Sequence, residues 1–130
     1  MKQLIQLLAL STSLIAAPSD IAVFATPEGA ADNPDFVIQG EYKGDGVDSD
    51  GKTVPAGVQV VALGKGMFSA TVFQGGLPGD GWNRDTKWIY SGKLSGENKV
   101  MFTSEDTVVV LHYNNSNLLA TKGDRRVGQF

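Results

Sequence analysis

Apolar and polar residues alternate along most of the chain from residue 35 onward, with the two-residue period of half-buried strands. Turn-forming segments interrupt this pattern: Gly-Lys-Gly at 64–66, Ser-Gly-Glu-Asn at 95–98 and Asn-Asn-Ser-Asn at 114–117. The predicted strands are residues 36–42, 58–63, 67–73, 87–94, 99–103 and 107–113, with one or two closing strands in 118–121 and 125–130. The pattern predicts an all-β protein, a small antiparallel meander of about seven strands that forms a barrel or a sandwich.

Alternation also predicts which strand positions face the core. The residues expected to be mostly buried are Phe36, Ile38, Val60, Phe68, Val72, Ile89, Val100, Phe102, Val108 and Val110. A domain of this size can bury a sufficient core without disulfides, so it does not need cysteines, although disulfides would be allowed outside the cytoplasm.

The N-terminal segment has the features of a secretory signal peptide over residues 1–25. Lys2 provides the positive charge, residues 4–17 form an apolar core, and Val23 and Ala25 are the small residues expected at positions −3 and −1 of the cleavage site. We therefore expect an extracytoplasmic protein, either periplasmic, at the cell surface or secreted.

The remainder of the chain divides into two parts. Residues 26–34 contain two prolines and a glycine without periodicity, and are expected to form a flexible leader. Residues 35–130 are expected to form a single β domain.

Charge gives no indication of a nucleic-acid or membrane partner. The formal net charge is −3 at pH 7, and charges of both signs are scattered along the chain. Lys122, Arg125 and Arg126 form a basic cluster that Asp124 interrupts, and it is interpreted as a solvated strand end.

Catalytic and metal-binding patterns are weak. His112 is the only histidine and there is no cysteine, so we expect a strand histidine that bonds to a neighbour, and neither a nucleophile–histidine pair nor a zinc site. Asp45, Asp48 and Asp50 have the carboxylates that calcium prefers, but Lys52 occupies the fifth position counted from Asp48, where an EF-hand needs an oxygen ligand. We expect a polar hairpin loop there, and neither a metal nor a cofactor.

The segment GGLPGDGW at residues 75–82 is the strongest candidate for a functional surface. Its glycines and proline specify a loop shape rather than a flexible connection. Trp82 would offer a flat apolar face to a sugar, while Asp80 and the amides of Gly79 and Gly81 would offer hydrogen bonds. One alternative is that Trp82 folds back to plug an end of the barrel. Another is that Asp80 and Asp85 form the carboxyl pair of a small glycoside hydrolase.

The same part of the chain carries a family resemblance. The run VQVVALG at 58–64, Phe68, the loop 75–82 and the segment GEYKG at 40–44 resemble a β-rich region of large secreted bacterial proteins. There it lies upstream of a 3-keto-disaccharide hydrolase domain, a concanavalin-like jelly roll. The resemblance spans about residues 35–94, and it implies an extracytoplasmic, carbohydrate-associated setting. The sequence ends at Phe130, about where that hydrolase domain would begin, so its activity is not carried over.

Residues and resemblance together predict an exported, non-catalytic β-module associated with carbohydrate processing. Its loop at 75–82 would face a glycan or a neighbouring hydrolase domain. The alternatives are the small hydrolase that uses Asp80 and Asp85, and a purely structural or protein-interaction domain.

Overall fold

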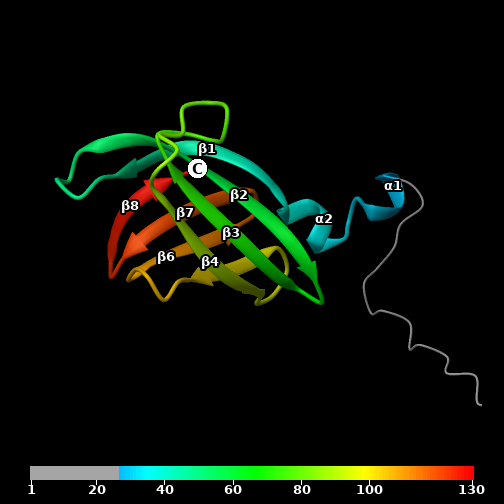
Figure 1. Cartoon of the computed structure of the whole chain (residues 1–130). Helices are drawn as coiled ribbons and strands as arrows, with labels where there is room; N and C mark the ends of the chain where they lie inside the picture. Colours follow the sequence, from blue (N-terminus) through cyan, green and yellow to red (C-terminus); the bar gives the residue numbers. More distant parts are fainter. Residues whose placement is uncertain (1–26) are drawn as a thin grey trace, which may run out of the picture.

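The computed structural model describes residues 27–130, which fold into eight antiparallel strands closed into one barrel (Figure 1). The predicted signal peptide at 1–25 lies outside the described residues. The elements are α1 (Pro27–Ala30), α2 (Pro34–Ile38), β1 (Gly40–Val47), β2 (Thr53–Gly64), β3 (Met67–Gln74), β4 (Lys87–Leu94), β5 (Lys99–Thr103), β6 (Val109–Asn114), β7 (Asn117–Lys122) and β8 (Arg125–Gln129).

The strands follow one another around the barrel in chain order. Each pairs antiparallel with the next, and β1 closes the ring on β8 through the pairs Asp45↔Gln129 and Gly46↔Gly128. Closure leaves no unpaired sheet edge for another chain to extend. The all-β prediction is confirmed, and of the two predicted architectures the barrel is the one present.

The hairpin turns use the residues that the sequence indicated. Lys65, Asn98 and Asn115 have φ values of 56°, 51° and 45°, the left-handed conformation that tight hairpin turns require. Because these turns fix the register, the predicted bounds of β4 and β5 agree with those in the structure.

The segment before β1 is helical, and the prediction of a strand starting at Phe36 is wrong. Asn33 caps helix α2 by accepting a hydrogen bond from the backbone N–H of Asp35 at 2.9 Å, and Pro34 occupies the first turn. Ile38 is fully buried, whereas Phe36 is 47% exposed. Within the predicted leader 26–34, the described residues comprise α1 and the start of α2.

The core fills the half of the barrel that lies near α2. Of the predicted core, Ile38, Val60, Phe68, Val72, Val100 and Phe102 are buried. Phe36, Ile89 and Val108 are 47%, 55% and 71% exposed, and Val110 is only half-buried, so these four assignments are wrong. In β4 apolar residues occupy both faces, and the larger Trp88 and Tyr90 face inward in place of Ile89. Val108 precedes the start of β6 and lies in a loop.

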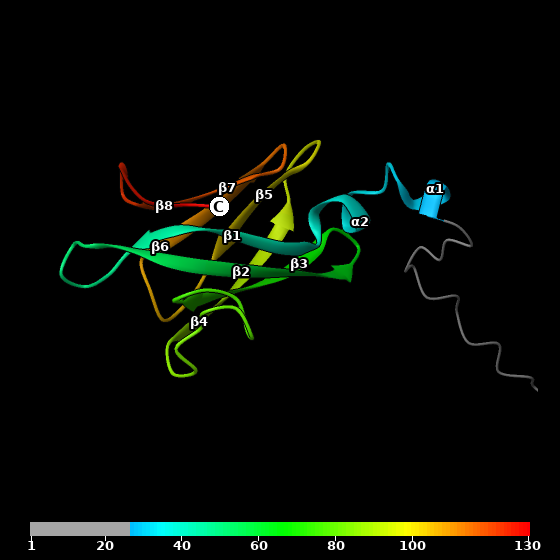
Figure 2. The ribbon, with the colours of Figure 1, turned by 90° about the horizontal axis from the view of Figure 1, so that it is seen from above.

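The two ends of the barrel differ. At one end α2 lies beside the β2–β3 and β4–β5 turns, and at the other the β1–β2 and β7–β8 hairpins extend outward (Figure 1). The long β3–β4 connection, residues 75–86, lies outside the ring of strands (Figure 2). No helix within residues 27–130 has the length and apolar character needed to cross a membrane.

Candidate functional site: the barrel cavity and the β3–β4 loop

A cavity of about 580 Å³ occupies the half of the barrel opposite α2. Its walls come from seven of the strands, all except β5, and from the β1–β2 loop, Thr86, Thr107 and Phe130. Ala56, Tyr90, Leu111 and Ala120 lie at its deep end and are buried. The next inward residues along β2 and β6, Val58 and Tyr113, belong to the packed core. The cavity therefore reaches from the mouth to about the middle of the barrel.

The walls of the cavity are mainly apolar. The apolar side chains that line it are Val47, Val54, Ala56, Val72, Trp88, Tyr90, Val109, Leu111, Ala120, Val127 and Phe130. Trp88, Val109, Val127 and Phe130 are only partly buried, although they pack against the core. These side chains leave apolar surface facing an unfilled space, unlike a close-packed interior.

A few polar groups interrupt this apolar wall. The Tyr90 hydroxyl hydrogen-bonds with the Thr107 side chain, and burial raises the pKa of Tyr90 above its usual value. Tyr90 therefore stays neutral at physiological pH. Gln74 also lines the cavity, and Lys122 and Arg125 lie where β7 and β8 reach the mouth.

The β3–β4 loop packs against the outer wall of the barrel. Leu77 is buried over Gly57 of β2, where an added Cβ would come within 2.7 Å of the Leu77 backbone nitrogen. Trp82 packs edge-to-face on Phe73 with ring centroids 5.1 Å apart, and its indole N–H donates to the Thr86 carbonyl at 3.1 Å. Phe73 alternates with the inward Val72, so this contact lies on the outside. The loop has a defined shape and its own small apolar core.

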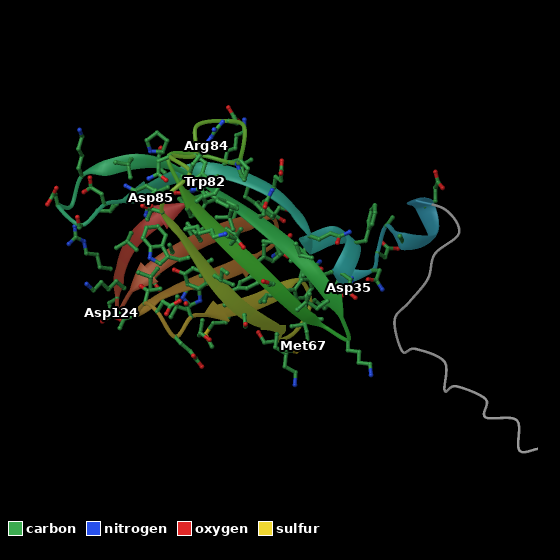
Figure 3. The ribbon with its side chains drawn as sticks, in the orientation of Figure 1. Asp35, Met67, Trp82, Arg84, Asp85 and Asp124 are labelled. Carbon is green, nitrogen blue, oxygen red and sulfur yellow. The ribbon has the colours of Figure 1, made fainter. Side chains whose placement is uncertain are left out.

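The predicted site residues Gly79, Asp80, Gly81 and Trp82 all lie on this outer loop. The glycines and Asp80 are exposed, and Trp82 is half-buried. Figure 3 shows Trp82 near Arg84 and Asp85 of the same loop. Asp80 forms an ion pair with Lys43 of β1, which ties the loop tip to the barrel wall. Trp82 does not plug an end of the barrel, because the chain path carries it over the outer face of β3 instead.

The two aspartates of the hydrolase alternative have different surroundings on the β3–β4 loop. Asp80 pairs with Lys43, and Asp85 lies exposed in a turn where its N–H bonds to the Asn83 side chain. Neither lines the barrel cavity. The described residues thus give no support to a catalytic pair.

The other candidate residues have structural roles. The Nε2 atom of His112 lies 3.0 Å from the Thr121 hydroxyl, as expected for a strand histidine bonded to a neighbour. Asp48 accepts hydrogen bonds from the backbone N–H groups of Asp50 and Lys52, which confirms a polar hairpin loop. Within residues 27–130 no cluster of three or more histidine, cysteine, aspartate or glutamate side chains is arranged to hold a metal.

Sequence reasoning missed the cavity and its cationic mouth. Lys122 is exposed at the end of β7, as expected for a solvated strand end, and it also lines the cavity. The sequence does contain a signal for this position. Lys122 follows Leu118 and Ala120 at two-residue spacing, and because those two residues are buried, the same inner face of β7 continues to Lys122.

No protein-family model, curated protein or solved structure matches the chain.

Proposed function

We propose that this protein is a non-catalytic binding module whose barrel holds one small, mainly apolar molecule. The observation that carries this proposal is the cavity of about 580 Å³ in the open half of the barrel. Ligand sites typically have volumes of about 300–1,000 Å³, and barrel mouths are a common place for them. An eight-stranded barrel has an interior just wide enough for side chains or for one small ligand.

The distribution of side chains inside the barrel supports a ligand. Near α2, large residues such as Phe68, Phe102 and Tyr113 fill the interior. At the deep end of the cavity, beside Tyr90 and Leu111, the inward positions are occupied by the small residues Ala56 and Ala120. A barrel that served only as a scaffold would gain stability from larger residues at these two alanines. The small side chains are explained if a guest molecule completes the packing.

The cavity residues favour binding over catalysis. Its titratable side chains are Asp48, Tyr90, Lys122 and Arg125. Asp48 is held by two backbone N–H groups, and burial raises the pKa of Tyr90 further above its already alkaline ordinary value. This set offers no activated nucleophile with an adjacent base. We retain the exported, carbohydrate-associated setting as part of the proposal, with the sequence resemblance as its support.

Binding of N-phenyl-1-naphthylamine, an uncharged apolar dye whose fluorescence rises in apolar surroundings, tests the proposal. Ala120→Phe should fill the cavity and abolish the fluorescence gain. Val61→Phe is the matched control, because Val61 is 53% exposed on the outer wall and the added ring would stay outside. Loss of binding in Ala120→Phe alone is the expected result. No binding to the natural protein, or equal binding by both variants, would overturn the proposal.

The β3–β4 loop supports a second candidate function, a glycan-binding surface. Trp82 keeps part of its ring exposed beside the exposed Asp80, and both are held in place by Phe73 and Lys43. A pre-formed aromatic and carboxylate pair suits the apolar face and hydroxyls of a sugar. Titration of the wild type and of Trp82→Ala with a panel of disaccharides tests this candidate: binding that Trp82→Ala removes would support it.

A further inference from the structure

We propose that the molecule held in the barrel is an amphiphile with an anionic head group, which Lys122 and Arg125 hold at the mouth. This inference rests on the proposed function, since it assigns the chemistry of the ligand of that same cavity. It specifies an acyl or similar apolar chain that ends in a carboxylate.

The two cations lie together where the cavity opens. Lys122 and Arg125 are directly paired at the end of the β7–β8 hairpin, and both line the cavity. Lys122 follows the inward residues Leu118 and Ala120 along β7. Figure 3 shows Asp124, in the turn between the two cations, at the end of the barrel away from Asp35 and α2. The positive charges therefore stand at the entrance and the apolar walls lie behind them.

Neither cation is neutralised within the described chain. The salt bridge found among residues 27–130 joins Lys43 to Asp80 on the outer wall, and the side chains of Lys122 and Arg125 have no hydrogen-bond or ion-pair partner there. By contrast the neighbouring Arg126, which does not line the cavity, donates to the Gln129 side chain at 3.3 Å. Lys122 and Arg125, both exposed, therefore keep an unneutralised positive charge beside the cavity.

The acidic groups near the mouth do not cancel this charge. Asp48 is the acidic residue that lines the cavity, and one of its carboxylate oxygens accepts hydrogen bonds from two backbone N–H groups of its own loop. The exposed Asp124 is not part of the lining. The lining therefore carries two positive charges and one negative charge, in a protein whose net charge is −3.

This arrangement matches the two ends of a carboxylate amphiphile. Its chain would lie against Val72, Leu111 and Phe130, where removal of apolar surface from water stabilises the complex. Its carboxylate would stay at the mouth, where the Arg125 guanidinium can donate two parallel hydrogen bonds and Lys122 adds a point charge. A cationic head group would be repelled at the same place.

Competition against bound N-phenyl-1-naphthylamine tests the inference with three decyl compounds that differ in the head group. Decanoate should displace the dye at a concentration about five- to tenfold lower than 1-decanol, the ratio expected for about 1 kcal/mol of partly screened ion pairing. Decyltrimethylammonium should be the weakest competitor. At 0.5 M NaCl the advantage of decanoate should shrink while the affinity of 1-decanol does not fall, because salt screens exposed charges.

The variants Lys122→Gln and Arg125→Gln should each reduce the advantage of decanoate, and the double variant should make decanoate and 1-decanol equal. Arg126→Gln is the matched control and should leave the difference intact. If the dye binds but decanoate and 1-decanol compete equally in the natural protein, the anionic head group is wrong and the apolar site stands. If Ala120→Phe does not affect dye binding, the proposed function itself fails.

Discussion

The indole ring of Trp82 lies edge-on against the phenyl ring of Phe73, with centroids 5.1 Å apart and planes at 68°. This contact fixes the β3–β4 loop to the outside of the barrel, and Lys87 places its ammonium 6.0 Å from the same indole ring. Because the loop is held outside, residues 75–82 do not fill the barrel interior. The two candidate surfaces, loop and cavity, are therefore separate and can be tested by separate substitutions.

Replacement of Trp82 by alanine should lower the free energy of unfolding by about 1–3 kcal/mol. Full truncation of a buried aromatic costs about 3–5 kcal/mol, and Trp82 is only half-buried. Urea denaturation measures the change, and Trp82→Phe is the control that keeps a ring on Phe73. A loss as large as that of Phe68→Ala would show that Trp82 belongs to the main core.

Gly57→Ala should detach the β3–β4 loop from the wall. An added Cβ would lie 2.7 Å from the Leu77 backbone nitrogen, a contact that only a backbone shift can relieve, at a cost of about 1–3 kcal/mol. Faster hydrogen exchange at Asp80 and Trp82, whose N–H groups donate to the Leu77 carbonyl, reports the detachment. Gly46→Ala is the control, since its Cβ would meet its nearest neighbour at 3.8 Å. Equal protection in both variants would contradict the role of Gly57.

Phe68→Ala should lower the free energy of unfolding by about 3–5 kcal/mol, because this ring is buried at 1% exposure and packs edge-to-face on Phe102. Ile89→Ala is the matched test of the strand faces. Since Ile89 is 55% exposed on the outer wall, its truncation should cost less than about 1 kcal/mol. If Ile89→Ala lowered the denaturation midpoint more than Phe68→Ala, the inward and outward faces of these strands would be the reverse of those described.

Stability should decline at alkaline pH because of Tyr90, which is buried, and Tyr42, which is partly buried against the core. Burial, with the nearby Tyr113, raises the pKa of Tyr42, and burial raises that of Tyr90, both from an ordinary value of 10.0. When the folded-state pKa lies above the unfolded one, the stabilisation is complete below pH 10 and is lost as the pH rises toward the folded-state pKa. The free energy of unfolding should fall above pH 10 by up to about 1.4 kcal/mol per pH unit for each tyrosine.

Tyr42→Phe isolates this pH effect. The variant loses the hydrogen bond from the Tyr42 hydroxyl to the Ile38 carbonyl, 2.5 Å long, so it should be less stable at pH 7. Its stability should nevertheless fall less steeply than that of the wild type between pH 10 and 11. Parallel curves for the two proteins would argue against a neutral Tyr42 that packing shields from water.

The strand pattern could be predicted where local signals agree. In β4 and β5 the alternation and the turn at 95–98 indicate the same bounds, and the structure has them. Helix α2 could not be predicted from alternation, because Phe36, Ile38 and Tyr42 mimic a strand, although Asn33 and Pro34 provide a helix start signal. In this segment the capping residues, rather than the apolar spacing, indicate the conformation.

The site was harder to predict than the strands. The alternation along β7 places Lys122 on the inner face, but it does not reveal whether that face meets packed side chains or an open space. Whether the inner face of β7 meets packed side chains or a cavity depends on how far the inward side chains of the other strands reach. It therefore depends on the closure of the whole barrel. The loop at 75–82 could be recognised from its glycines, whereas its attachment to Phe73 and Lys43 required the structure.

The most direct test of the central claim is the position of a bound apolar molecule relative to the two faces of the barrel wall. Intermolecular nuclear Overhauser effects between the aromatic protons of N-phenyl-1-naphthylamine and the protein methyl groups measure this position. The account predicts contacts to Val72, Leu111 and Val127, which line the cavity. Contacts to Val61 and Leu63, which are exposed on the outer wall, in place of these three would contradict it.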